Sequence, residues 1–120
     1  MFQVEPSAQQ YRAGAAALFI IAMLTAAMIA VTWAKGFTGP LLLPLMVAYF
    51  LFNAGFVFVA VKAGLQTRGA RLGHAAVLLN IGAMLSSDFT PVWTALSAAA
   101  ALGSLVAAYM LLKDAKATTA

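Results

Sequence analysis

The stretch AGAAALFIIAMLTAAMIAVTWA, residues 13–34, runs for 22 positions without a charged side chain. Arg12 stands immediately before it and Lys35 immediately after it. As an α-helix the stretch would be about 33 Å long at roughly 1.5 Å per residue, enough to cross a hydrocarbon core of roughly 30 Å. Backbone groups in lipid must be paired within the segment, and the stretch lacks the alternating pattern of a barrel strand. It therefore predicts a transmembrane helix.

The composition of the whole chain agrees with a lipid environment. Of its 120 residues 64% are hydrophobic and 8% are charged, and the mean hydropathy is +0.96. An average soluble domain is roughly 45–50% apolar and about 25% charged, so the surface of this protein must itself be apolar. The net charge of +4 comes from basic residues scattered at segment ends without a basic stripe, which argues against nucleic-acid binding. The absence of cysteine excludes disulfides and thiolate metal sites.

Three more apolar runs follow, and they predict a single membrane domain, residues 1–120, built as an antiparallel up-down bundle of four transmembrane helices. Ser7 is expected to cap a first helix that starts before the membrane, and Pro40 and Pro91 suit the first positions of the second and fourth helices. The third run is short, is expected to begin near Gly69, and leaves open whether it crosses the bilayer fully. The predicted spans are approximately 13–34, 40–61, 70–87 and 91–112.

The basic residues predict the orientation. Six of the seven lie at one end of the four-span arrangement, whereas the other end carries only Lys35, opposed by Asp88. By the positive-inside rule both termini and the middle connection are cytoplasmic, as expected for a prokaryotic inner-membrane protein. Trp33 and Trp93 then fall at the outer interface, where indoles are enriched. The six basic residues are Arg12, Lys62, Arg68, Arg71, Lys113 and Lys116.

Rows of residues at helical spacing predict which faces pack together, because small side chains let helices approach closely in lipid. The first span has a row of alanines: Ala22, Ala26 and Ala30. The third span has a row of small or polar residues: Gly73, Ala76, Asn80, Ala83 and Ser87. The row through the asparagine of the second span is bulkier: Met46, Tyr49, Asn53, Phe56 and Ala60.

Asn53 and Asn80 lie near mid-membrane on neighbouring antiparallel spans. One interpretation is structural: the two amides hydrogen-bond each other or a carbonyl and fix the helix register. The other is functional: they form a polar constriction or a solute contact together with Tyr49, Thr94 and Ser97. The sequence leaves both interpretations open.

The remaining polar residues do not form a catalytic set. His74 is the only histidine; it is expected near the cytoplasmic interface, and axial ligation of a haem or a chlorophyll-type pigment is an alternative. Asp88 fits a turn between the third and fourth spans. No carboxylate or lysine lies within the spans, so an ion-coupled carrier is not indicated. We expect no enzymatic activity and no protein-built metal site.

These observations favour a non-catalytic accessory subunit of a larger membrane complex, bound through partner subunits or by self-association. Phe52 and Phe56 are predicted to face a partner. The alternative is a small homo-oligomeric channel or carrier for a neutral or weakly charged solute, using Asn53 and Asn80. A minor alternative is a haem- or pigment-binding subunit that uses His74.

Overall fold

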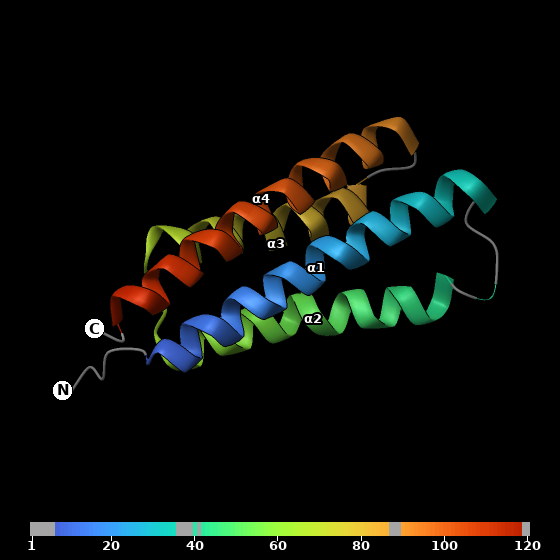
Figure 1. Ribbon diagram of the computed structural model, residues 1–120. Coiled ribbons are helices and arrows are strands. Elements are labelled where there is room, and N and C mark those ends of the chain that lie inside the picture. The colour runs from blue at the N-terminus through green and yellow to red at the C-terminus, as the bar shows by residue number, and fades with distance from the viewer. Residues whose placement is uncertain (1–6, 36–39, 41, 87–89, 119–120) are drawn as a thin grey trace.

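The computed structural model describes residues 7–35, 40, 42–86 and 90–118. Within these ranges the protein consists of four α-helices and no strand, as the sequence predicted. The helices run alternately up and down, and the start of the first helix lies at the same end of the bundle as the end of the fourth (Figure 1). The helices are α1 (Ala8–Lys35), α2 (Leu42–Ala63), α3 (Arg68–Ser86) and α4 (Thr90–Thr118).

The helices pack in a definite order. The two long helices, α1 with 28 residues and α4 with 29, lie side by side (Figure 1). Helix α2 packs against α1, and α3 packs against α4. The backbones of α2 and α3 come close at only a few points, so side chains must bridge the space between these two helices.

The start of α1 is capped as predicted. Ser7 N–H donates to Gln10 Oε1 at 2.8 Å, and Gln10 N–H donates to Ser7 Oγ at 3.2 Å. This reciprocal pair satisfies backbone donors that have no partner inside the helix. The helix therefore begins at Ala8, before the predicted span at 13–34, as expected for a helix that starts outside the membrane.

The connection between α2 and α3 is built on Gly64. This glycine has φ +71°, in the left-handed region, and its N–H donates to Val61 O at 3.2 Å. Leu65 N–H donates to Ala60 O at 2.9 Å, and the Leu65 side chain is buried in the core. Together these contacts form a Schellman C-cap with its usual apolar contact. Helix α3 begins at Arg68, the residue after Thr67. The Oγ1 of Thr67 accepts a hydrogen bond from Ala70 N–H at 3.4 Å.

Three of the four helices are long and apolar enough to cross a membrane: Ala8–Ala34, Leu43–Ala63 and Pro91–Thr118. The exception is α3, which has 19 residues and includes Arg68 and Arg71 in its first turns. The predicted end of the third span, Ser87, and the predicted turn residue Asp88 lie outside the described residues.

The packing rows are correct for α3 and wrong for α1. Residues 73, 76, 80 and 83 of α3 are all buried. In α1, Ala22 is buried but Ala26 and Ala30 are exposed. The buried face of α1 instead carries larger side chains, including Leu18 and Ile21, because it fits between two neighbouring helices.

Phe56 does not face a partner, contrary to the sequence prediction. Its side chain is fully buried inside the bundle. A Cβ atom added to Gly73 of α3 would lie 2.6 Å from Phe56 Cζ and 2.9 Å from Leu18 Cδ1. The ring thus fills the gap between α2 and α3 at the point where α3 has no side chain. The row through Asn53 had already placed Phe56 on the packing face of α2, and residues 49, 53, 56 and 60 of that row are buried. The prediction failed because a large aromatic side chain was assigned to a partner instead of to the core.

Helices α3 and α4 cross most closely at Gly69. A Cβ atom at this position would lie 2.9 Å from Met110 Cβ, 3.2 Å from Leu111 N and 3.3 Å from Ala107 O. Two of these neighbours are backbone atoms, which cannot rotate away. The crossing therefore requires glycine.

We predict that Gly69→Ala lowers the free energy of unfolding by about 1–3 kcal/mol, because the added methyl group forces the two helices apart. Gly55→Ala is the control, since a Cβ there has nothing within 4 Å. It should be neutral or stabilise by up to about 1 kcal/mol through helix propensity. Unfolding by SDS in mixed micelles measures both changes. Equal stability of the two variants would contradict the close crossing.

Candidate functional site

Two apolar clusters fill the bundle. One includes Leu18, Phe56 and Leu111 and lies toward the end that holds the termini; the other includes Met28 and Trp93 and lies toward the opposite end. Along each helix, a buried polar side chain lies between members of the two clusters. We call this set the polar layer: Thr25 of α1, Asn53 of α2, Asn80 of α3, and Ser97 and Ser104 of α4.

The two asparagines meet in the polar layer. Asn53 Nδ2 donates to the carbonyl of Tyr49 at 2.7 Å, one turn earlier in α2. Asn80 Nδ2 donates to Asn53 Oδ1 at 3.4 Å, which joins α3 to α2. Both side chains are buried, at 2% and 0% exposure. The predicted contact between them is therefore present, although its length indicates a weak bond.

The layer also holds polar atoms without a protein partner. Asn80 Oδ1 and Ser104 Oγ are buried and accept or donate no hydrogen bond. Thr25 behaves differently, because its Oγ1 donates to Ile21 O at 2.8 Å within its own helix. An unpaired amide oxygen in an apolar interior is unfavourable by about 1–3 kcal/mol. Asn80 and Ser104 are therefore residues of the layer with unused hydrogen-bonding capacity.

An open groove of about 390 Å³ lies beside the layer, where α2 and α3 diverge. Among the described residues that line it, Asn53 is the polar one. The apolar lining consists of Phe50, Ala54, Val57 and Phe58 of α2 with Val77 and Ile81 of α3.

The other predicted contact residues divide between the layer and the bundle end. Tyr49 is buried at 2% exposure, and Ser97 belongs to the layer. Thr94 does not: its Oγ1 accepts a hydrogen bond from Trp33 Nε1 at 2.7 Å and ties the end of α1 to the start of α4. Sequence reasoning did not single out Thr25. The available signal was its position near the middle of the first span.

His74 lies half-buried near the start of α3. Its Nδ1 is 2.8 Å from the carbonyl oxygen of Ala70, so Nδ1–H donates and Nε2 is left as the acceptor. The imidazole meets the Phe56 ring edge to face, with centroids 5.2 Å apart. Histidines that ligate a metal are often oriented by a hydrogen bond from their other ring nitrogen to a backbone carbonyl. The haem or pigment alternative for His74 therefore stays a prediction. Among the described residues, no group of three His, Cys, Asp or Glu could hold a metal ion.

The outward face of α2 carries a regular apolar stripe. Four of its members are 51–69% exposed, and all recur at spacings of four and three, the rhythm of a coiled-coil seam. The predicted partner residue Phe52 is 37% exposed and lies off this stripe. We call the stripe the outer seam of α2: Val47, Leu51, Ala54, Phe58 and Val61.

Comparison with known proteins gives no relative: no family model, curated protein or solved structure matches this chain. The polar layer, the groove and the outer seam are therefore the features of the protein that bear on its function.

We predict that Asn53 and Asn80 are energetically coupled. Asn53→Leu and Asn80→Leu should each change the free energy of unfolding, and the double variant should differ from the sum by about 0.6 kcal/mol, the typical value for a hydrogen bond between membrane helices. SDS unfolding of the four proteins measures this coupling energy. Strict additivity would show that the 3.4 Å contact contributes nothing to the register.

Proposed function

We propose that this protein is a non-catalytic integral membrane subunit whose α2 packs against an apolar transmembrane helix of a larger partner. The observation that supports the proposal is the outer seam. Its side chains follow the spacing that lets two helices interlock, and its four larger members are 51–69% exposed. Helix α2 thus has an inner seam occupied by its own bundle and an outer seam that is free to take a second helix.

The physical reason for a protein partner lies in how helices associate in lipid. Lipid tails are as apolar as leucine, so burial of apolar surface gives no net drive, and close packing decides. Ala54 stands at the centre of the outer seam between the larger Leu51 and Phe58, and it also lines the groove. A small residue flanked by large ones accepts a protruding side chain from an approaching helix.

The orientation is part of the proposal. Helix α1 begins, α2 ends, α3 begins and α4 ends at the basic end of the bundle (Figure 1). By the positive-inside rule this end faces the cytoplasm of a prokaryotic cell. Helix α3, about 28 Å long by its 19 residues, then crosses the membrane with its two arginines reaching back to the headgroups.

Single cysteines test this orientation cleanly, because the chain has none of its own. We predict that Gln66→Cys, in the α2–α3 connection, reacts with a membrane-impermeant maleimide only after the cells are permeabilised. Pro40→Cys, before α2, should react on intact cells. Both positions are exposed in the structure. The reverse labelling pattern would place the basic end outside.

Co-purification from native membranes in a mild detergent tests the partner. The protein should carry a larger membrane protein at fixed stoichiometry, and Val47→Ala with Leu51→Ala should weaken that association roughly tenfold or more. The matched control is Leu102→Ala with Val106→Ala on α4, since these residues are also exposed, at 65% and 51%. The control should keep the partner.

The other outcomes contradict the proposal. Equal loss of the partner in both double variants would mean that the outer seam has no special role. A homo-oligomer without any other protein would remove the accessory-subunit function. A visible absorbance band that disappears in His74→Ala would favour the pigment alternative instead.

A second candidate function is passage or binding of a neutral or weakly charged solute by a homo-oligomer. The unpartnered Oδ1 of Asn80 and the groove beside Asn53 favour it. The same Asn53→Leu and Asn80→Leu variants separate the two functions: solute flux in liposomes should be abolished if the asparagines line a route. Unchanged flux would leave them a structural role only.

A further inference from the structure

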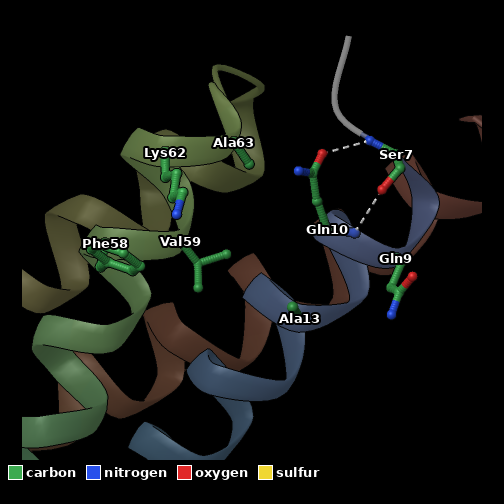
Figure 2. Close-up of a pocket in the computed structure, with 8 residues that line it drawn as sticks. All are labelled: Ser7, Gln9, Gln10, Ala13, Phe58, Val59, Lys62 and Ala63. Atoms are coloured by element: carbon green, nitrogen blue, oxygen red, sulfur yellow. Dashed lines mark hydrogen bonds between the residues drawn. The ribbon is translucent and has the colours of Figure 1, made fainter. Parts of the chain in front are cut away.

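A second cavity, of about 430 Å³, lies between the first turns of α1 and the last turns of α2. It is open to one side and combines two kinds of surface (Figure 2). Its polar lining consists of Ser7, Gln9, Gln10 and Lys62, and its apolar lining consists of Ala13, Phe58, Val59 and Ala63.

The polar lining donates hydrogen bonds more than it accepts them. Gln10 Oε1 is engaged by Ser7 N–H at 2.8 Å, which turns the amide nitrogen of Gln10 toward α2 (Figure 2). From the opposite wall, Lys62 Nζ lies 5.3 Å from the centre of the Phe58 ring, so the ammonium group is held over the apolar part of the cavity. None of the residues described as lining the cavity carries a carboxylate. An anion is therefore the complementary ligand.

The position of the cavity identifies the kind of anion. It lies at the basic end of the bundle, where the described acidic residue is Asp114. In the orientation proposed above this end faces the cytoplasmic leaflet, at headgroup level. The apolar wall of the cavity continues toward the membrane interior along α1 and α2. A ligand with an anionic head and an apolar tail matches both parts.

We propose that this cavity binds one anionic glycerophospholipid, with its phosphodiester between Lys62 Nζ and the Gln10 amide and its acyl chains along the α1–α2 surface. The site rests on the proposed membrane orientation but not on the partner of the outer seam. It differs from general attraction of lipids to basic residues, because it requires one lysine and one amide on two helices.

The chain contains a matched control for Lys62. Lys113 also lies near the end of a helix at the same end of the bundle, and its Nζ is 5.6 Å from the centre of the Tyr109 ring. It does not line the cavity. Lys62→Gln and Lys113→Gln therefore remove the same charge from similar surroundings, and only the first removes it from the proposed site.

The test is native mass spectrometry of the full chain after reconstitution into phosphatidylcholine vesicles that contain a minor share of phosphatidylglycerol. Wild type and Lys113→Gln should retain one phosphatidylglycerol. Lys62→Gln should bind it about fivefold more weakly, corresponding to about 1 kcal/mol for one cation at an anionic surface. Gln10→Glu should also lose the lipid, because it replaces a donor with a negative charge while its carboxylate can still accept from Ser7 N–H. Unchanged thermal unfolding in detergent confirms that each variant is folded.

Two results would overturn the proposal. Equal loss of lipid in Lys62→Gln and Lys113→Gln would reduce the effect to diffuse charge attraction. Release of the lipid from wild type by inorganic phosphate would show a site for a free anion, without a requirement for acyl chains.

Discussion

The ring of Phe56 sets the distance between three helices. It extends from α2 to α3, where Gly73 leaves room for it, and Leu18 of α1 reaches the same point. Because apolar burial does not hold helices together in lipid, the position of α2 depends on such close fits. A smaller side chain at Phe56 would leave a void between α2 and α3, and a larger one at Gly73 would overlap the ring. The Asn53–Asn80 contact lies next to this fit and depends on the spacing that it sets.

Much of the architecture could be predicted from the sequence, because uncharged runs and charges mark the ends of helices directly. Pro40 is an exception: it was expected at the first position of the second helix, but α2 begins at Leu42. The capped start at Ser7 and the contact between Asn53 and Asn80 followed from spacing and depth alone. The row through Asn53 also marked the buried face of α2, but Phe56, a member of that row, was assigned to a partner because of its aromatic side chain. Thr25 was missed although its position near the middle of the first span was visible in the sequence; its hydrogen bond to Ile21 O within its own helix is seen only in the structure.

The arrangement is the reverse of a soluble bundle. Polar side chains gather at mid-height inside, in the polar layer, and the most regular apolar stripe faces outward on α2. In water such a protein would be poorly packed, and its exposed apolar surface would favour aggregation. In lipid, buried amides and hydroxyls can favour one helix register over shifted ones, and an apolar stripe with this spacing can pack against another helix.

The pairing of α1 with α4 has a consequence for how the protein is made. Of the four described helices, α1 is synthesised before the others yet packs chiefly against α4, while α2 and α3, which come in between, hardly approach each other. The surface of α1 around Gly14, which lies against Leu111 of α4, is therefore incomplete until α4 has been inserted. A nascent chain halted after α3 would expose this surface to the bilayer, where quality-control proteases could recognise it. Synthesis of α4 is thus the step that completes the packing of the described bundle.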